Sequence, residues 1–342
     1  MLAWSLDAAI ATGASRIITV VPRQSEQIQE WLGGYDFCIQ DKPLGTGHAV
    51  LAAAPSLAGF DGVALIMFAD TPLVTADTLT RLASSIDAQT AVAVLGFETA
   101  DPHGYGRLVI DNEGQLEQII EDKNANINEQ SITLVNGGIM AVRCPLLFDL
   151  LDQVQPNSKS GEIYLTDIIA LANKNGHKVT CQIADEAEVS GVNDRADLAY
   201  LETILQHRLR QAAMHQGATL IAPETVFLSA DTILGQDVTI EPHVVIGPNT
   251  NIGEGSIIKS FSHIEGTTLG SGCVIGPYAR LRSGTEAGDG VKIGNFVETK
   301  KSIIGARSKA NHLTYIGDSV IGTDANVGAG TITCNYDGFG KF

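Results

Sequence analysis

The stretch LGQDVTIEPHVVIGPNTNIGEGSIIKSFSHI, residues 234–264, carries an aliphatic residue at every sixth position without a slip. A six-residue spacing matches neither the 3.6-residue turn of an α-helix nor the two-residue alternation of a strand in an open sheet. It is the hexapeptide signature of a parallel β-helix, in which each repeat supplies one short strand and one turn. We therefore predict a prism whose interior is filled by the repeated side chains, namely Leu234, Ile240, Ile246, Ile252, Ile258 and Ile264.

The same period continues toward the end of the chain, with one break. Where an aliphatic residue followed by glycine is expected at 310–311, the sequence has Ala310-Asn311, followed at once by His312. A lone histidine in a repeat is more often a surface residue. However, a scaffold that only has to stack has no need of an imidazole, so we interpret this position as functional. After a five-residue step from Ile264, the period resumes at Leu269, Ile275, Leu281 and Ala287, and Ile293 follows.

The charge of the chain is strongly negative and unevenly placed. The 342 residues carry 22 Lys and Arg against 39 Asp and Glu, a net charge of −17. Residues 1–200 hold 11 basic and 26 acidic side chains, whereas residues 201–342 hold 11 and 13. Such an acidic chain argues against a nucleic-acid partner, because no basic surface is available for a phosphate backbone. A small phosphorylated substrate stays possible, since it needs only a few local cations or a metal ion.

Neither a membrane nor an export route is indicated. No apolar run reaches the roughly 18 residues that a membrane span needs. The opening MLAWSLDAAIATGASRIITVV has no basic start and contains Asp7, so a signal peptide is not expected. The five cysteines include no CxxC pair, which favours reduced thiols and a cytoplasmic location.

The first half of the chain has a different sequence pattern, in which apolar runs alternate with amphipathic segments. Thr75 or Asp77 can cap the helix at 75–86, and Gly176 can end the helix at 162–176. Such alternation predicts a Rossmann-like α/β domain with a mostly parallel sheet covered on both faces and ligands beyond the carboxyl ends of its strands. We predict strands at 16–21, 63–68, 90–97 and 137–142, a further helix at 48–57, and one long helix at 196–215 between the halves.

Ordered motifs extend over essentially the whole chain. The first half contains QDKPLGTGHA (40–49), FADTPL (68–73), DPHGYGRL (101–108), IIEDKNA (119–125), VNGGI (135–139), GEIYLTDII (161–169) and GVNDR (191–195). The second half contains IGPYARLRSG (275–284), KIGNFVETKKS (292–302), KANHLTYIGD (309–318) and GAGTITCNYDG (328–338). With these motifs the chain resembles the bifunctional bacterial N-acetylglucosamine-1-phosphate uridyltransferases / glucosamine-1-phosphate acetyltransferases.

The resemblance implies a sugar-nucleotidyltransferase domain at 1–195, a linker helix at 196–217 and a left-handed parallel β-helix acetyltransferase domain at 218–342. It implies acetyl transfer from acetyl-CoA to glucosamine 1-phosphate. Uridylyl transfer from UTP to N-acetylglucosamine 1-phosphate then releases pyrophosphate and gives UDP-N-acetylglucosamine. Mg²⁺ is the implied cofactor and a homotrimer the implied assembly. The implied role is cytoplasmic synthesis of precursors for peptidoglycan and lipopolysaccharide.

The resemblance also raises an expectation about the ends of the chain. Family members begin with a strand and a glycine-rich loop that holds the triphosphate, and they finish with further β-helix coils that complete the coenzyme A site. We expect this chain to be a fragment that lacks both parts. It should then have little uridyltransferase activity.

The candidate residues of the first half begin with Asp70. It follows the apolar run VALIMF and should stand at the carboxyl end of a strand, where a metal ligand or a simple turn carboxylate would fit. The resemblance favours a Mg²⁺ ligand, with Asn193 as the second ligand. A glycine-rich turn before a helix, as at 45–48, can approach a ligand closely, although a plain turn is the commoner meaning. By resemblance the nucleotide- and sugar-binding residues are Gln40, Gly45, Thr46, Phe68, Gly106, Glu121, Asn136 and Asn193.

The candidate residues of the second half surround His312. Acetyl transfer to an amine needs a base that works near neutral pH, which suits imidazole. By resemblance His312 is that general base and Glu298 orients it. Two departures from the family pattern are Phe68-Ala69, where Tyr-Gly is usual, and Asn311, where Gly is frequent. The residues implied to bind the sugar phosphate, the acetyl group and the cofactor are Arg282, Lys300, Tyr315, Asn326, Ala329, Asn335, Tyr336 and Lys341.

Two other functions stay open at this point. The chain could be a single-activity sugar-1-phosphate nucleotidyltransferase whose β-helix only assembles subunits. In that case the polar residues from 282 to 336 would be incidental, and no thiol would be released from acetyl-CoA. It could also be a regulatory or assembly module that binds sugar nucleotides without turnover, although Asp70, Asn193 and His312 argue against that.

Overall fold

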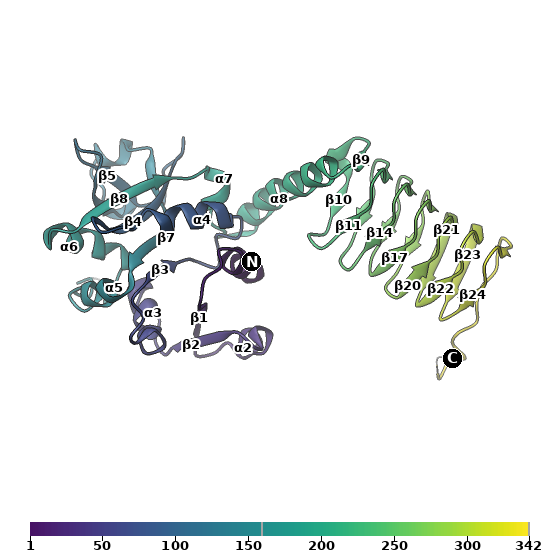
Figure 1. The fold of residues 1–342 in the computed structure, drawn as a ribbon, viewed down its shortest axis with the longest axis horizontal. Coiled ribbons are helices and arrows are strands. Elements are labelled where there is room, and N and C mark those ends of the chain that lie inside the picture. The colour runs from purple at the N-terminus through teal and green to yellow at the C-terminus, as the bar shows by residue number, and fades with distance from the viewer. Residues whose placement is uncertain (159, 341–342) are drawn as a thin grey trace. The chain divides into compact units, whose positions relative to one another are not determined.

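The computed structural model describes residues 1–158 and 160–340. The chain forms two compact units, Met1–Leu201 and Glu202–Phe342, and each is described by itself (Figure 1). The division falls inside helix α8 (Arg195–His215). The bounds of this helix are close to the predicted ones, 196–215. Within the described residues, no helix combines the length and the apolar character that a membrane crossing requires.

Unit 1 is an α/β domain around a six-stranded sheet ordered β6-β5-β7-β4-β8, with β3 paired to β7. Alternate residues of the buried strand β4 enter two different cores, so both faces of the sheet are covered. Val92 and Val94 pack with helices α5 (Cys144–Leu151) and α6 (Ile168–Lys174), whereas Ala93 and Leu95 pack with α4 (Ala76–Ser84). The strands are β3 (Val63–Ile66), β4 (Thr90–Glu98), β5 (Arg107–Ile110), β6 (Leu116–Ile120), β7 (Leu134–Arg143) and β8 (Lys178–Ile183).

Of the helices predicted in unit 1, the one at 75–86 is found at 76–84, the one at 48–57 is an α-helix at 46–52 followed by a 3₁₀ turn, and the one at 162–176 begins only at 168. The Thr75 hydroxyl accepts a hydrogen bond from the Thr78 N–H at 3.3 Å and caps α4. Gly176, with φ +79°, follows α6 as predicted. The helices are α1 (Leu2–Ala11), α2 (Glu26–Leu32), α3 (Thr46–Ala52), α4 (Ala76–Ser84), α5 (Cys144–Leu151), α6 (Ile168–Lys174) and α7 (Glu186–Val189). Short 3₁₀ turns are η1 (Ala54–Leu57), η2 (Asp122–Asn124), η3 (Glu129–Ser131) and η4 (Leu165–Asp167).

The direction of the strands corrects one prediction. β4 and β8 are parallel, but β7 runs antiparallel to β3, β4 and β5, so the six-stranded sheet is mixed rather than mostly parallel. Parallel neighbours need a long crossover, whereas antiparallel neighbours need only a turn. Between β4 and β7 the chain makes the antiparallel hairpin β5–β6, turned at 111–114 with Gly114 at φ +80°. This hairpin brings the chain back in the opposite direction.

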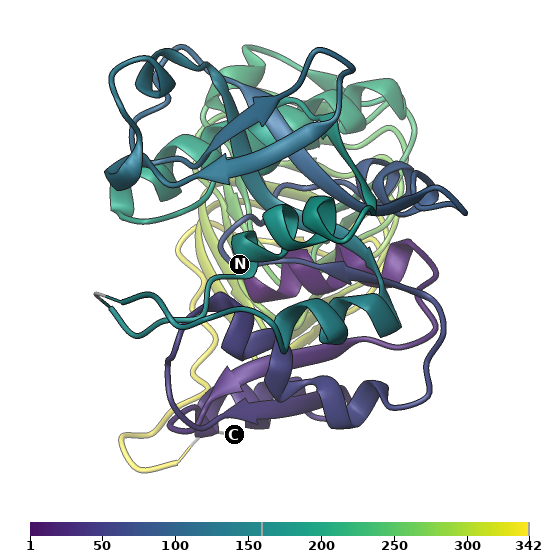
Figure 2. The same ribbon diagram turned by 90° about the vertical axis from the view of Figure 1, so that its left-hand side faces the viewer.

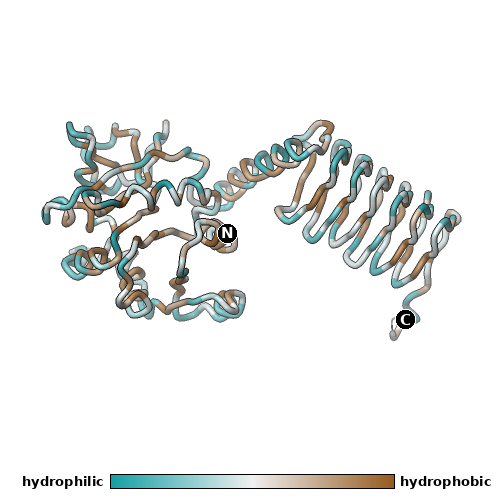
Figure 3. The backbone as a smooth tube through the Cα atoms, in the orientation of Figure 1, coloured by the Kyte–Doolittle hydropathy of each residue, from teal (hydrophilic) through white to brown (hydrophobic). Residues whose placement is uncertain are grey.

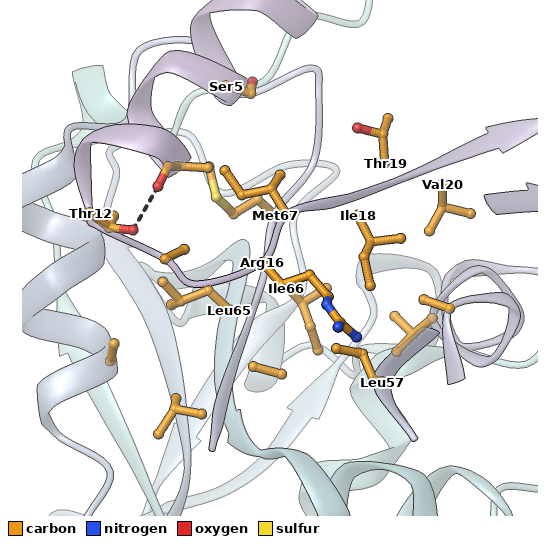
Figure 4. Close-up of a pocket in the computed structure, with 18 of the residues that line it drawn as sticks. Ser5, Thr12, Arg16, Ile18, Thr19, Val20, Leu57, Leu65, Ile66 and Met67 are labelled. Atoms are coloured by element: carbon orange, nitrogen blue, oxygen red, sulfur yellow. Dashed lines mark hydrogen bonds between the residues drawn. The ribbon is translucent and has the colours of Figure 1, made fainter. Parts of the chain in front are cut away.

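A second, smaller sheet completes unit 1. β1 (Ile18–Pro22) and β2 (Asp36–Gln40) pair in parallel, apart from the larger sheet (Figure 2, purple). A cavity of about 620 Å³ lies between β1 and β3, lined mainly by apolar side chains that include Ile18, Leu65 and Ile66 (Figure 4). Among the described residues, no strand of the smaller sheet pairs with a strand of the larger one.

Unit 2 is the predicted parallel β-helix. Residues one coil apart pair in parallel along a single row that runs Ile240, Ile258, Ile275, Ile293 and Ala310. The predicted interior positions from Ile240 to Ile293 are all at most 5% exposed, and Leu234, in the first coils, is half-buried. Hydrophobic segments recur on successive coils in Figure 3. The hexapeptide prediction is therefore confirmed.

Three rows of strands form the faces of the prism, here called the first, second and third faces. On the first face lie β9 (Thr219–Leu220), β12 (Thr239–Ile240), β15 (Ile257–Ile258), β18 (Val274–Ile275) and β25 (Asn326–Val327). On the second face lie β10 (Phe227–Leu228), β13 (Val245–Ile246), β16 (His263–Ile264) and β19 (Arg280–Leu281). On the third face lie β11 (Ile233–Leu234), β14 (Asn251–Ile252), β17 (Thr267–Leu269), β20 (Thr285–Ala287), β22 (Ser302–Ile304) and β24 (Val320–Ile321). Two longer strands, β21 (Lys292–Lys300) and β23 (Lys309–Gly317), pair on both the first and the second face.

The C-terminal part of α8 belongs to the β-helix. The Gln206 amide exchanges hydrogen bonds with the backbone of Leu228 at 2.8 and 2.9 Å, and Arg210 donates to the Val226 carbonyl at 3.1 Å. Ala213 joins the core of the prism. These contacts satisfy buried polar groups at the open end of the coil, together with the 3₁₀ turn η5 (Pro223–Thr225).

Candidate functional site

The site of unit 2 lies at the corner between the first and second faces. Here β21 and β23 continue around the corner in register, so that Asn295 is opposite His312. The imidazole of His312 is exposed, and its Nδ1 lies 2.9 Å from the Asn295 Oδ1. On the next coil, the Gly330 N–H donates to the Leu313 carbonyl at 3.0 Å, which places Ala329 beside His312. The corner therefore presents an amide, an imidazole and a small residue on three successive coils.

The interior anchor is not lost at this corner. Ala310 is 3% exposed and occupies the core position predicted for an aliphatic residue. His312 lies two residues further on, outside the prism. Asn311 is extended in β23, and the left-handed residue here is Leu313, at φ +47°. The repeat is thus interrupted by a smaller interior side chain, that of Ala310, followed two positions later by the surface imidazole of His312.

The two predicted phosphate-binding cations lie at the other end of the second face. Arg280 pairs with Glu298, and Leu281 with Thr299, so Arg282 and Lys300 stand on neighbouring coils at the same register. From His312 to Gly317, which pairs with Lys300, the strand advances five residues. At about 3.3 Å per residue this is at most roughly 16 Å along the chain, because the left-handed Leu313 bends the strand, and the long arginine and lysine side chains shorten the gap further.

The structure places the Glu298 side chain beside Arg282. The Glu298 Oε1 lies 2.9 Å from the Arg282 Nη1, and both side chains are about one-third exposed. Among the described contacts, the partner of the His312 ring is Asn295, not Glu298. Glu298 lies three residues further along β21, opposite Tyr315, because strand pairing fixes its position. It therefore contacts the arginine in this structure, and its role toward the imidazole stays a prediction.

Tyr315 stands midway between the imidazole and the cations. Its hydroxyl accepts a hydrogen bond from the Asn335 Nδ2 at 3.3 Å, and Asn335 also donates to the Asp318 carboxylate. Asp318 was not predicted, although it ends the motif KANHLTYIGD. The structure thus brings the predicted Tyr315 and Asn335 into direct contact.

The remaining predicted residues of unit 2 are less closely connected. Asn326 is exposed on β25, on the first face, opposite Lys309. Tyr336 is 59% exposed, and its hydroxyl donates to the Gly338 carbonyl at 2.8 Å. Lys341 lies outside the described residues.

In unit 1, the segment 161–169 connects two groups of predicted residues. The Leu165 N–H donates to the Thr46 hydroxyl at 3.0 Å, and the Gly47 N–H donates to the Ile163 carbonyl at 2.9 Å. At the other end of the segment, the Thr166 hydroxyl donates to the Glu121 carboxylate at 3.2 Å. The segment therefore links the glycine-rich loop to the proposed sugar end.

The glycine-rich loop has a backbone that favours glycine. Gly45 has φ +100° and ψ 175° and precedes α3. A Cβ at this position would lie 2.5 Å from the Ile163 carbonyl oxygen. Gln40 holds the loop from the end of β2, because its Nε2 donates to the Gly45 carbonyl at 3.1 Å. The loop thus approaches the 161–169 segment more closely than a larger residue would allow.

The three residues expected at the sugar lie at one end of the β5–β6–β7 sheet. Arg107 pairs with Ile120 and with Val135, so the adjacent Gly106, Glu121 and Asn136 meet there. The Asn136 N–H donates to the Gly106 carbonyl at 2.8 Å. Next to them, the ring of Phe68 packs against Gly138. A Cβ added at Gly138 would lie 2.9 Å from the Phe68 Cδ2.

A buried ion pair that the sequence reading missed supports this end of the sheet. Arg107 is 2% exposed, and its Nη2 lies 2.8 Å from the Asp122 Oδ1. The backbone N–H of Gly104 and then the Arg107 guanidinium lower the pKa of Asp122. The motifs DPHGYGRL and IIEDKNA contain both partners, but only the hairpin pairing brings them together.

The two predicted metal ligands stand on adjoining loops. The Val192 N–H donates to the Asp70 carbonyl at 2.9 Å, which holds the Asn193 loop against the Asp70 loop. The Asp197 carboxylate accepts from the Asn193 N–H at 2.9 Å, and this bond is the main cause that lowers the pKa of Asp197. Both candidate ligands are exposed. A carboxylate and an amide oxygen on adjoining loops are the kinds of donor that Mg²⁺ takes, and it often uses only one or two protein ligands.

Comparisons with known proteins match both halves. The model "MobA-like NTP transferase domain" matches residues 1–129, and "Bacterial transferase hexapeptide (six repeats)" matches residues 231–266. The chain is 48% identical over 327 residues to the bifunctional protein GlmU of Sphingopyxis alaskensis, covering 95% of this chain and 72% of that protein. It is 47% identical over 345 residues to GlmU of Azorhizobium caulinodans and 49% identical over 346 residues to GlmU of Xanthobacter autotrophicus. In both cases the matched region covers 100% of this chain and 77% of the relative. Because the identity extends over most of both chains, this chain belongs to the GlmU family of bifunctional proteins.

Proposed function

We propose that this protein makes UDP-N-acetylglucosamine, with an acetyl-transfer site in unit 2 and a uridylyl-transfer site in unit 1. Membership of the GlmU family and the transferase models that match both halves support the two activities. The observation that carries the acetyl-transfer half is the corner with the exposed His312. That corner lies on the same pair of strands as Tyr315 and Lys300.

In the proposed acetyl transfer, glucosamine 1-phosphate lies along the second face with its phosphate toward Arg282 and Lys300. The sugar nitrogen attacks the thioester carbonyl carbon, and His312 takes up the proton that the nitrogen loses. A C–N bond forms and the C–S bond breaks. The coenzyme A thiolate leaves and receives the proton, which returns the imidazole to its neutral form. Tyr315 and Asn326 complete the sugar site.

The other residues of unit 2 would serve the acetyl donor. Asn335 and Tyr336 would lie at the acceptor and the acetyl group. Ala329 would offer backbone beside the thioester, and Lys341 would contact substrate or cofactor. The bond between Asn335 and Tyr315 supports a joint role for these two residues.

In the proposed uridylyl transfer, a phosphate oxygen of N-acetylglucosamine 1-phosphate attacks the α-phosphorus of UTP, and the bond to pyrophosphate breaks. Asp70 and Asn193 would hold Mg²⁺, which when bound neutralises charge on the phosphates. Positioning of the two substrates then accounts for much of the acceleration. The residues proposed to bind the nucleotide and the sugar are Gln40, Gly45, Thr46, Phe68, Gly106, Glu121 and Asn136.

The proposal extends to the cellular setting. We propose a cytoplasmic homotrimer that supplies precursors for peptidoglycan and lipopolysaccharide. The straight hexapeptide prism supports this assembly, because its flat faces suit packing around a threefold axis. Size measurement by light scattering tests the trimer.

The experiment that tests the function measures both half-reactions in the full-length protein, since little uridyltransferase activity is expected of residues 1–342 alone. In His312→Ala we expect thiol release from acetyl-CoA to fall by about 10²–10⁴-fold, the usual contribution of a general base. Pyrophosphate release should equal that of the unsubstituted protein. His263→Ala, which removes another exposed histidine of the second face, is the control. A protein that releases no thiol before any substitution would instead favour a single-activity nucleotidyltransferase.

A further inference from the structure

We infer that Asn295 is the residue that positions His312 and selects its tautomer, a role that the Glu298–Arg282 pair leaves unfilled. The inference rests on the proposed acetyl-transfer function and adds a residue to it. It starts from the 2.9 Å contact between the His312 Nδ1 and the Asn295 Oδ1.

The chemistry of the two atoms sets the direction of this hydrogen bond. An amide oxygen carries only lone pairs, so the ring nitrogen opposite it has to be the donor. His312 therefore carries its proton on Nδ1, and the Nε2 keeps a free lone pair. That lone pair is the one available to the sugar amine, since the Nδ1 is turned toward the neighbouring coil.

The backbone holds the two residues in place. Asn295 and His312 are paired residues of β21 and β23, one coil apart. A Cβ at Gly294 would collide with the carbonyl oxygen of Asn311, so the two coils approach here as only glycine allows. The amide is thus carried by a rigid strand rather than by a loop.

An uncharged partner suits the proposed base. A carboxylate beside an imidazole favours the protonated ring, which could not accept a proton from the amine. An amide oxygen fixes the tautomer with a much weaker effect of that kind. The charged residues on the same two strands are Lys292, Glu298, Lys300 and Lys309, and Glu298 is already paired with Arg282.

The test compares Asn295→Ala and Asn295→Asp with Asn251→Asp, a change of the same type at an exposed residue of the third face. In Asn295→Ala we expect kcat for acetyl transfer to fall about 10–100-fold, as when a partner that orients a functional histidine is removed. The KM for glucosamine 1-phosphate should stay within twofold. Asn295→Asp keeps the acceptor oxygen, so its rate should return toward that of the unsubstituted protein at alkaline pH.

A second measurement needs no turnover. Diethyl pyrocarbonate modifies neutral imidazole, and peptide mass spectrometry follows His312 alone. In Asn295→Asp the midpoint of its modification should move up by about one pH unit, because an opposite charge at hydrogen-bond distance favours the protonated ring. Asn251→Asp should leave it in place.

Three results would overturn the inference: an unchanged kcat in Asn295→Ala, an unmoved midpoint in Asn295→Asp, or equal loss in both variants at every pH. Failure of the proposed function would look different. In that case His312→Ala would keep full acetyl transfer, while the midpoint shift in Asn295→Asp could still occur.

Discussion

Gly45→Ala should destabilise unit 1 and weaken UTP binding, because no β-carbon fits in the glycine-rich loop. Gly45 has φ +100° and ψ 175°, a region that is essentially restricted to glycine and costs other residues about 1–3 kcal/mol. A Cβ would also lie 2.5 Å from the Ile163 carbonyl oxygen and 3.0 Å from its nitrogen. Both atoms are backbone and cannot rotate away.

The size of the effect follows from what has to move. Relief of the clash shifts Ile163, which accepts from the Gly47 N–H at 2.9 Å and donates to the Leu44 carbonyl at 2.8 Å. Each of these bonds contributes about 0.5–1.5 kcal/mol. Added to the backbone cost, these bonds give an expected fall in the free energy of unfolding of about 2–6 kcal/mol. The control is Gly59→Ala, where φ is +75° but no atom lies within 4 Å, with an expected loss of about 1–2 kcal/mol.

Urea unfolding followed by tryptophan fluorescence measures the loss of unfolding free energy of unit 1 specifically, because both tryptophans, Trp4 and Trp31, lie in that unit. Equilibrium dialysis with UTP measures binding. Equal destabilisation by Gly45→Ala and Gly59→Ala would refute the argument that the 161–169 segment closes on the loop.

Three further outcomes are expected. Asp70→Ala should abolish the Mn²⁺ binding that electron paramagnetic resonance detects in unit 1, and Asp77→Ala, on the surface of α4, should not; retained binding would remove Asp70 from the metal site. The lowered pKa of Asp122 means that its contribution to stability is complete above the pKa of the unfolded chain and is lost as the pH falls through the folded pKa. Acid titration of unfolding midpoints should therefore show a steeper loss below about pH 4 in the unsubstituted protein than in Asp122→Asn, and parallel curves would contradict this. Ile258→Ala, at 0% exposure, should cost the β-helix about 2–5 kcal/mol by hydrogen exchange, against about 1 kcal/mol or less for its 37% exposed neighbour in Ile257→Ala.

The sequence predicted the two-unit organisation because its signals are local and periodic. The six-residue period identified the interior positions of the prism, and the α4 cap at Thr75 needed only its own turn. The direction of β7 was not predicted, because strand periodicity carries no information about the direction of a neighbour. The chain reverses through a short hairpin whose turn residues were not weighed.

The candidate site divides in the same way. His312 could be identified as a candidate functional position from the sequence alone, because a polar residue that interrupts a strict repeat can be recognised without a structure. The resemblance assigned Glu298 to that imidazole, whereas the residue that contacts the ring in the structure is Asn295, three residues away on β21. Which of them reaches the ring depends on the pairing of two coils, and that pairing puts Asn295 opposite the histidine and Glu298 opposite Tyr315. Period and composition thus determine where chemistry can occur, whereas contacts between residues 17 positions apart are decided only when the coils stack and bring their side chains within hydrogen-bond distance.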